Sequence, residues 1–260
     1  MNLQVLISTM NRKSIDELNI LGKNINPSTS CVITNQTDNE NKESIDNIKM
    51  INYNEIGIAR NRNRSLQNAS EDICILSDDD VEYVKDFEKI IEQAFIDNPD
   101  ADIITFQAMT PQGEMFKNYR NEEFEHNKMT ILRTSTIEIA FKLKSIKNNN
   151  IKFDNEFGLG STYASGEENI FLMDCLNKGL KIKYIPKVIV LHEKESSGKI
   201  LNEAAIYSKG PLFYRLFGPI SVFLNFAFII KKLPIIRFNR FKAIKLIYKG
   251  MLDYIKLNNR

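Results

Sequence analysis

Hydrophobic residues in the first hundred positions form short runs that alternate with stretches of helical spacing. Five apolar runs have the length of β-strands: residues 3–8, 30–34, 48–53, 72–77 and 101–107. Three stretches between them have the periodicity of helices: residues 14–21, 58–69 and 84–98. This alternating order predicts an α/β domain with a mostly parallel sheet and helices on both of its faces.

The second half of the chain is less regular. Residues 167–179 have helical periodicity, and residues 181–192 have the composition of a strand. Residues 111–128 are polar and loop-like, whereas residues 134–147 fit a strand or the edge of a helix. From about residue 207 aromatic and aliphatic residues mix with lysines and arginines, so we predict a domain boundary near residue 205.

The composition fits a folded protein in a reducing compartment. Hydrophobic residues make up 43% of the chain, which allows a packed core. Cys31, Cys74 and Cys175 lie far apart without the paired spacing of a zinc site, so we expect buried, reduced thiols. The N-terminus shows no signal peptide, and the longest uncharged apolar run, residues 216–230, is too short to cross a membrane. We therefore expect a cytoplasmic protein.

Charge is distributed unevenly along the chain. Residues 209–260 contain eleven lysines and arginines but one acid, Asp253, which gives this tail a net charge of +10. Because the whole chain carries +2, the preceding residues carry −8. We therefore predict basic amphipathic helices in residues 206–260. An anionic membrane surface is the partner we favour for them; packing on the rest of the protein is the alternative, and we expect no nucleic acid.

Three adjacent aspartates, Asp78, Asp79 and Asp80, follow the apolar run at residues 72–77. Neighbouring carboxylates repel one another, so clustering them is costly unless a cation compensates. Mn²⁺ or Mg²⁺ suits this position, because such ions bind one or two carboxylates together with substrate phosphates. Ligands of open α/β sheets also bind at the carboxyl ends of the strands. We therefore predict a divalent metal site rather than a solvated acidic turn.

Two further clusters stand where helices are predicted to begin. Arg60, Arg62 and Arg64 would oppose the helix dipole there, which indicates an anionic ligand such as a diphosphate. Arg60 and Arg64 share a helix face, and Arg62 points elsewhere. Glu167 and Glu168 follow a glycine-rich loop, where a carboxylate can act as a general base toward a hydroxyl. A solvated basic face and ordinary helix capping are the structural alternatives.

Taken together, these clusters resemble the family-2 glycosyltransferases, which have the GT-A fold. The resemblance covers about residues 1–200. Four blocks carry it in the expected order: residues 5–12, the first strand and nucleotide loop; 57–64, the arginine-bearing helix start; 77–81, the Asp-x-Asp motif; and 153–168, the acceptor loop with its acid pair. The resemblance implies a catalytic domain at residues 1–205, with a nucleotide-sugar half at about 1–107 and an acceptor half at about 108–205.

The resemblance also implies a function for each block. It implies inverting transfer from a nucleotide-diphosphate sugar, with UDP as the expected nucleotide, to a hydroxyl of a glycan or lipid-linked acceptor in cell-surface polysaccharide synthesis. Glu168 would be the catalytic base, with Glu167 as the alternative. The residues expected to contact the nucleotide sugar are Thr9, Asn11, Arg12, Asp38, Arg60, Asp78 and Asp79. The residues expected to hold Mn²⁺ or Mg²⁺ are Asp80, Asp78 and His192.

Two other functions stay open at this point. A phosphatase with an Asp-x-Asp nucleophile would carry its motif on the first strand, followed by a small or hydroxyl residue, whereas Glu82 follows here. A non-catalytic sugar-nucleotide-binding subunit of a polysaccharide assembly complex would not need Asp80 and Glu168. We therefore favour an enzyme that is peripheral on the inner face of the cell membrane.

Overall fold

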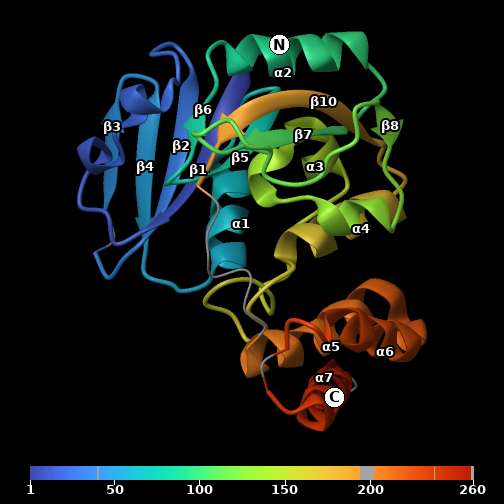
Figure 1. The fold of residues 1–260 in the computed structure, drawn as a ribbon. Coiled ribbons are helices and arrows are strands. Elements are labelled where there is room, and N and C mark those ends of the chain that lie inside the picture. Colours follow the sequence, from blue (N-terminus) through green and yellow to red (C-terminus); the bar gives the residue numbers. More distant parts are fainter. Residues whose placement is uncertain (40, 194–201, 237, 259–260) are drawn as a thin grey trace.

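The computed structural model describes residues 1–39, 41–193, 202–236 and 238–258. One large β-sheet carries helices on both faces, and three further helices form a separate layer at the C-terminal end (Figure 1). The α/β architecture predicted from the alternating apolar pattern is confirmed.

The strands lie side by side in the order β3-β4-β2-β1-β5-β9-β7-β10-β6, and β8 pairs with β10. The neighbours β4, β2, β1 and β5 are parallel, as are β7 and β10, whereas β9 runs antiparallel between β5 and β7. The strand bounds are β1 (Leu3–Met10), β2 (Ser30–Gln36), β3 (Lys42–Ile45), β4 (Ile48–Tyr53), β5 (Ile73–Asp78), β6 (Glu82–Tyr83), β7 (Ile103–Met109), β8 (Phe124–Glu125), β9 (Ile139–Lys142) and β10 (Ile182–Leu191).

Most of the longer helices match the predicted helical stretches. The α-helices are α1 (Ile58–Asn68), α2 (Phe87–Asp97), α3 (Leu143–Asn148), α4 (Glu167–Asn177), α5 (Glu203–Phe217), α6 (Ser221–Lys232) and α7 (Arg240–Asn258). Short 3-10 helices are η1 (Ile15–Leu18), η2 (Ile20–Lys23), η3 (Thr130–Arg133), η4 (Thr136–Glu138) and η6 (Gly218–Ile220).

Side chains on the central strands alternate between two hydrophobic cores, one on each face of the sheet. In β1, Val5 and Ile7 point to the core that α2 covers, and Leu6 points to the core beneath α1 and α4. The same alternation in β5 separates Ile75 from Leu76. The three cysteines are buried free thiols, as expected. Both faces of these strands are therefore covered, which leaves the strand ends as the place for polar side chains.

One stretch differs from its predicted structure, and a second contains both of the structures considered for it. The helix expected at residues 14–21 is instead the pair η1 and η2, because Asn19 and Asn24 adopt left-handed conformations, with φ of 45° and 60°, that end each turn. Residues 134–147 contain both of the structures considered for them, since β9 leads directly into α3.

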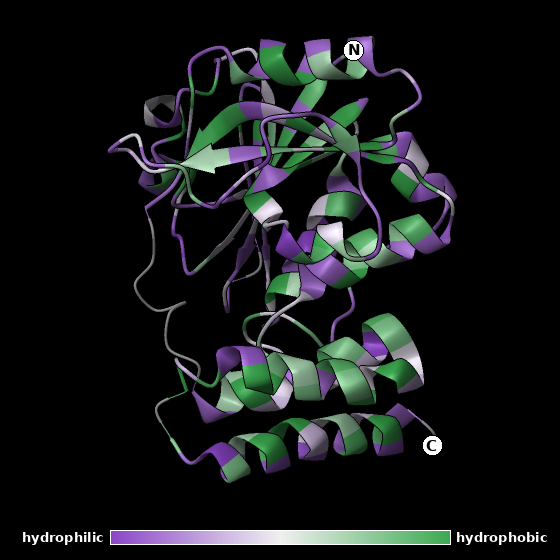
Figure 2. Ribbon diagram, turned by 45° about the vertical axis from the view of Figure 1, so that its right-hand side comes forward, coloured by the Kyte–Doolittle hydropathy of each residue, from purple (hydrophilic) through white to green (hydrophobic). Residues whose placement is uncertain are grey.

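The C-terminal helices α5, α6 and α7 pack on one another. A Cβ atom at Gly210 of α5 would overlap the backbone of Ile247, and one at Gly250 of α7 would overlap the backbone of Tyr207, so these two helices approach backbone to backbone. Gly218, with φ of 61°, separates α5 from α6. Figure 2 shows hydrophobic residues along all three helices.

One helical run in this layer meets the length and composition of a membrane span. Glu203–Lys232 covers 30 residues with a mean hydropathy of 1.6 in its most apolar window, of which 22% is buried. Residues 216–230 alone were expected to be too short to cross a membrane. The helical run is longer because it begins well before that uncharged stretch. The run is not straight, since Gly218 and Pro219 interrupt it between α5 and α6.

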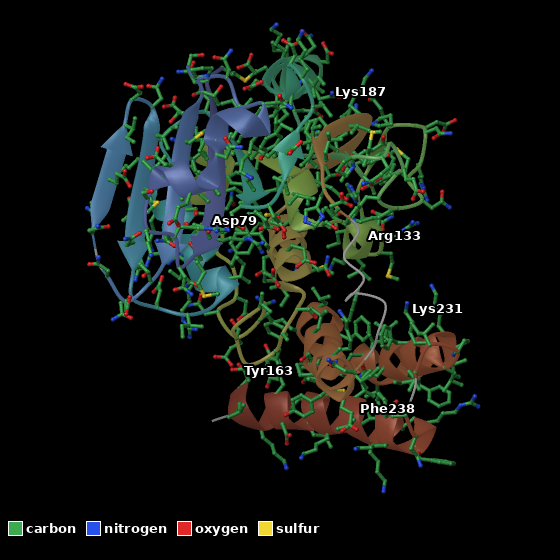
Figure 3. All side chains as sticks on the ribbon, turned by 60° about the vertical axis from the view of Figure 1, so that its left-hand side comes forward. Asp79, Arg133, Tyr163, Lys187, Lys231 and Phe238 are labelled. Carbon is green, nitrogen blue, oxygen red and sulfur yellow. The ribbon has the colours of Figure 1, made fainter. Side chains whose placement is uncertain are left out.

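The C-terminal layer is joined to the sheet domain through α5. Arg215 binds Asp154 at 3.0 Å and Asp174 at 2.8 Å, and Leu212 fills the space beside Gly166. Tyr163 lies at the junction between the two parts (Figure 3). Tyr254 of α7 also contacts Phe157 and Tyr163, with ring centroids 5.7 Å apart in each pair, so both α5 and α7 pack against the main fold.

Candidate active site

The carboxyl ends of β1 and β5 lie side by side, which places two predicted residues next to the aspartates. Ser8 pairs with Asp78 in the register of the two strands. Thr9 Oγ1 donates a hydrogen bond to Asp79 Oδ2 at 2.5 Å, and Arg12 Nη2 binds the same oxygen at 2.7 Å. The structure therefore brings the first and third sequence blocks together around Asp79.

Lys23 also contacts this loop, although no sequence motif singled it out. Its Nζ donates hydrogen bonds to the main-chain oxygens of Asp79 at 2.6 Å and of Val81 at 3.0 Å. Burial lowers the pKa of Lys23, while the charges of Asp79 and Asp80 oppose that shift. A lysine bound to two carbonyls fixes the path of the aspartate loop.

Arg62 is the central cation of the site. Its Nη2 lies 3.0 Å from Asp78 Oδ1, and its Nη1 lies 2.6 Å from Glu167 Oε1. Only 5% of the Arg62 side chain and 10% of the Glu167 side chain are exposed. Burial opposes the charged guanidinium, but Asp78 and Glu167 together raise the pKa of Arg62 above its ordinary value. The arginine therefore ties the aspartate loop to the acid pair.

The three arginines of α1 divide between two faces of the helix. Ala59, Arg62 and Leu66 are buried on the inner face, whereas Arg64 lies outside and binds Glu55. The sequence alone separated Arg62 from its neighbours but did not assign it a partner. Ala59 and Leu66 stand three positions before and four positions after Arg62, and they mark the buried face of the helix. This signal was available in the sequence.

The two acids at the start of α4 have different surroundings. Glu167 is buried and ion-paired with Arg62, whereas Glu168 makes no ion pair in the part of the chain that the structure describes. Burial, together with the negative charge of Glu167, raises the pKa of Glu168 to about 7. A carboxylate with such a pKa can accept a proton near neutral pH, which is the property required of a general base.

The glycine-rich loop before α4 fits tightly against this pair. Gly158 has φ of 101°, and a Cβ atom there would lie 2.5 Å from Ile58 and 3.0 Å from the Glu167 carboxyl. Leu159 O accepts a hydrogen bond from Ile58 N at 2.9 Å, which joins the loop to the start of α1. Glycine at 158 therefore lets the loop approach the acid pair closely.

His192, at the end of β10, meets Asp80 across the same edge of the sheet. His192 Nε2 lies 3.3 Å from Asp80 Oδ2, and 57% of the Asp80 side chain is exposed. Their hydrogen bond raises the pKa of His192 and lowers that of Asp80. Within the described ranges, no group of three or more His, Cys, Asp or Glu side chains gathers as a complete metal site. The pair is therefore at most part of a coordination shell.

Comparison with known proteins identifies the family. The sequence pattern of glycosyl transferase family 2 matches residues 35–171, which is more than half of the chain. The chain belongs to glycosyl transferase family 2. A comparison with curated protein sequences finds no match. The resemblance that the ordered motifs suggested is confirmed.

Solved structures similar to this glycosyl transferase include those of TarS from S. aureus. TarS 1-349 in complex with UDP-GlcNAc matches with a TM-score of 0.64 and 19% identity, over 98% of this chain and 81% of that one. TarS 1-349 without a named ligand matches with a TM-score of 0.59 and 16% identity, over 98% and 92% of the two chains. At such identities the likeness establishes the fold, and the expected GT-A fold is confirmed.

Three residues expected at the donor site of the glycosyl transferase make no hydrogen bond or ion pair to the aspartates among the described residues. Asn11, with φ of 58°, is exposed where β1 ends. Asp38 is exposed and accepts a hydrogen bond from Thr37 Oγ1 at 3.2 Å. Arg60 donates to Ile56 O at 3.0 Å. None of the three contacts the aspartate cluster in the hydrogen bonds and ion pairs of the described residues.

Proposed function

We propose that the protein transfers a sugar, with inversion, from a UDP-sugar to a hydroxyl of a glycan or lipid-linked acceptor in cell-surface polysaccharide synthesis. The family membership supports glycosyl transfer, and the TarS structures with UDP-GlcNAc and with UDP support the nucleotide. One observation carries the proposal: Arg62 binds both Asp78 and Glu167, whereas the adjacent Glu168 makes no ion pair among the described residues.

In this mechanism Glu168 is the general base and Glu167 is not. Glu168 takes the proton from the acceptor hydroxyl as the hydroxyl oxygen attacks the anomeric carbon of the donor. The bond between that carbon and the diphosphate oxygen breaks, and UDP leaves with the bonding electrons. Glu167 is ion-paired with Arg62. Because Arg62 of α1 also binds Asp78 at the end of β5, it links α1 to both β5 and α4. The arginine therefore orients the acid pair instead of meeting an incoming anion.

We propose Asp80 and His192, with Asp78, as the protein ligands of Mn²⁺ or Mg²⁺. The fit rests on the convergence of an exposed carboxylate and an imidazole at 3.3 Å, which leaves most of the coordination shell to donor phosphates and water. A bound divalent ion would neutralise the leaving diphosphate. Asp79 is held by Thr9 and Arg12 and so shapes the loop.

A screen of nucleotide sugars for hydrolysis tests this function. We expect release of UDP from one UDP-sugar in the presence of Mn²⁺ and without an acceptor. A protein that binds the nucleotide sugar but never releases UDP, with or without a glycan acceptor, would instead be the non-catalytic subunit. Hydrolysis of simple phosphate monoesters would favour the phosphatase alternative.

We also propose that residues 206–260 attach the enzyme to the anionic inner face of the membrane. One side of α6 exposes large apolar side chains to solvent: Val222, Phe223, Phe226 and Ile230. The exposed side of α7 carries Lys242, Lys245 and Lys249. Apolar groups that enter the interface, combined with lysines near anionic headgroups, are typical of peripheral membrane helices.

A further inference from the structure

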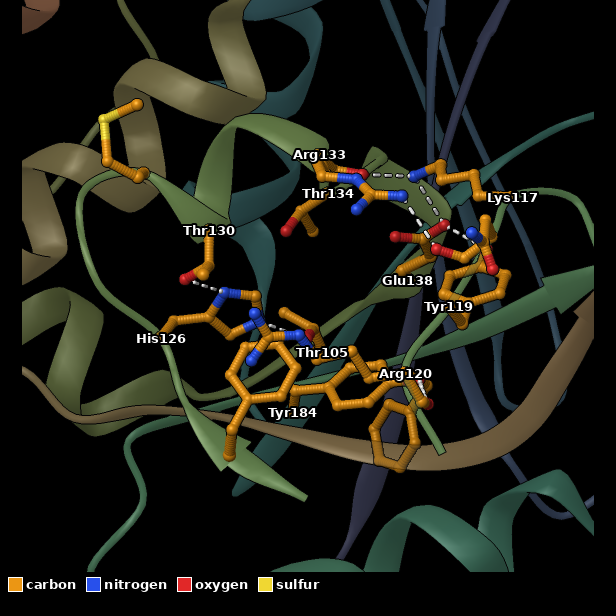
Figure 4. Close-up of a pocket in the computed structure, with 14 residues that line it drawn as sticks. Thr105, Lys117, Tyr119, Arg120, His126, Thr130, Arg133, Thr134, Glu138 and Tyr184 are labelled. Carbon is orange, nitrogen blue, oxygen red and sulfur yellow. Dashed lines mark hydrogen bonds and ion pairs between the residues drawn. The ribbon is translucent and has the colours of Figure 1, made fainter. Parts of the chain in front are cut away.

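A cavity lies beside β7 and β10, and none of the three aspartates lines it. It has a volume of about 160 Å³ and lies between β7, β10, η3 and residues 117–126. Its walls are mostly apolar and include Phe106, Phe124 and Tyr184, with Met129 beside them. Figure 4 shows Lys117 and Arg133 on one side of it, and His126 and Tyr184 on the other. Nothing in the proposed mechanism uses this space.

Two arginines at the cavity have no carboxylate partner in the described structure. Arg133 Nη2 donates to Asn118 O at 2.7 Å, and the guanidinium of Arg120 lies 4.8 Å from the centroid of the Phe124 ring. By contrast, the arginines at positions 12, 62, 64 and 215 all bind carboxylates. Both side chains are exposed. The cavity therefore combines apolar walls with two positive charges that remain available to an anion.

Hydrogen bonds between other groups also hold the walls in place. Tyr184 donates to Arg120 O at 2.7 Å, and Tyr119 donates to Glu138 at 2.6 Å. His126 lies between the hydroxyls of Thr105 and Thr130, and burial lowers its pKa to about 4, so it is neutral. The site is thus formed before any ligand enters, which reduces the entropic cost of binding.

The cavity is joined to the catalytic acids. Asn169, the neighbour of Glu168, donates its side-chain amide to Ile131 O at 3.2 Å, and Ile131 belongs to η3. Arg133 ends that same 3-10 helix. Lys117 pairs with Glu138 at 2.7 Å. Burial lowers the pKa of Lys117, and the negative charges of Glu138 and Glu168 oppose that shift. These contacts place the cavity beside the start of α4, which carries the proposed base.

We propose that this cavity is an acceptor subsite for a sugar unit that carries a phosphate group. The sugar ring packs on the apolar wall that Phe124 and Met129 form, with Tyr184 buried against Phe124 at a ring-centroid distance of 4.7 Å. The phosphate lies against Arg133 and Arg120, since guanidiniums bind phosphate through paired hydrogen bonds. The assignment to the acceptor rests on the proposed transferase function, but the binding itself does not.

Binding of glucose 6-phosphate, measured by ligand-observed NMR without nucleotide or metal, tests the subsite. We expect tighter binding than that of glucose or inorganic phosphate alone, because the ring and the anion contribute together. Arg133→Gln and Arg120→Gln are each expected to weaken binding about tenfold. Arg240→Gln, an exposed arginine on α7, is the matched control and should bind as wild type does. Arg120 makes few contacts, so its variant keeps the test valid even if Arg133→Gln unfolds.

Three outcomes would overturn the subsite. Equal binding of inorganic phosphate would remove the role of the apolar walls, and equal binding of glucose would remove that of the arginines. Unchanged affinity in Arg120→Gln and Arg133→Gln would place the ligand elsewhere. Because the measurement involves no turnover, loss of glucose 6-phosphate binding and loss of donor hydrolysis are separate results, and each refutes a different proposal. Glucuronate distinguishes a carboxylate from a phosphate as the preferred anion.

Discussion

Arg62 Nη1 lies 2.6 Å from Glu167 Oε1, which joins residues 105 positions apart in the chain. The other terminal nitrogen of the same guanidinium binds Asp78. The two adjacent glutamates therefore differ: Glu167 is ion-paired, whereas Glu168 makes no ion pair among the described residues. The arginine thus connects the aspartate loop to the acid pair and selects the proposed base.

We predict that Glu168→Gln abolishes sugar transfer and leaves donor binding intact, because glutamine keeps the shape of the side chain but cannot take a proton. Transfer rates and calorimetric binding of UDP check both parts. Glu156→Gln, an exposed acid of the preceding loop, is the control and should transfer normally. Near-normal turnover in Glu168→Gln would remove Glu168 as the base.

The raised pKa of Glu168 predicts two pH effects of opposite sign. Transfer should increase as pH rises through about 7, where the base loses its proton. Stability should decrease as pH rises from 4.5 to about 7, because over this range the folded state still holds the proton that the unfolded state has lost. Glu168→Gln should therefore be more stable than wild type at about pH 8. Urea denaturation across pH measures this, and an unchanged pH dependence of stability in the variant would contradict it.

Replacement of Arg62 should be costly to the fold. Arg62→Met leaves Glu167 buried without a partner, and breaking such a pair costs about 3–5 kcal/mol. Urea denaturation at neutral pH gives the free energy of unfolding. Arg60→Met is a matched control on the same helix, since Arg60 donates only to Ile56 O in the described structure. A loss below about 1 kcal/mol in Arg62→Met would show that Glu167 gains another partner.

The sequence predicted the elements of the sheet and the position of its polar edge, because both follow from local apolar patterns. It did not predict that Arg62 would be the buried cation, since its partners Asp78 and Glu167 are supplied by other elements. Lys23 was missed for the same reason: its ligands are main-chain carbonyls of a loop formed 56 residues later. Contacts between distant segments are not encoded in the periodicity of either one.

The cavity between β7, β10 and η3 shows a second limit of sequence patterns. Residues 111–128 are polar, and the sequence therefore indicated only a loop there. In the structure His126 is buried between two threonine hydroxyls and helps to form a wall. The aromatic residues Phe124 and Tyr184 come from β8 and β10, which pair antiparallel although they are far apart in the chain. The pocket exists only because of that pairing.

Removal of the proposed metal ligand should abolish the effect of metal on the donor. Asp80→Ala is expected to bind UDP with the same affinity in Mn²⁺ and in EDTA, whereas wild type should bind more tightly in Mn²⁺. His192→Ala should show a smaller loss, because imidazole supplies one ligand of several. Isothermal calorimetry measures each affinity, and Asp86→Ala, at the start of α2, is the control. Mn²⁺-dependent binding that survives in Asp80→Ala would place the ion elsewhere.

The exposed side of α6 provides a test of the proposed attachment to lipid. Phe223 and Phe226 are 75% and 52% exposed, and burying both in a membrane interface would contribute several kcal/mol, on the order of 1.5–3 kcal/mol for each side chain. Replacing both with glutamate removes that contribution and adds charge that anionic lipid repels. We therefore expect wild type, but not Phe223→Glu/Phe226→Glu, to co-sediment with vesicles that contain anionic lipid. Ile96→Glu, on α2 and 56% exposed, is the control and should still bind. Wild-type protein that stays in solution with such vesicles would defeat the membrane proposal, and full retention of the double variant would assign the attachment to α7.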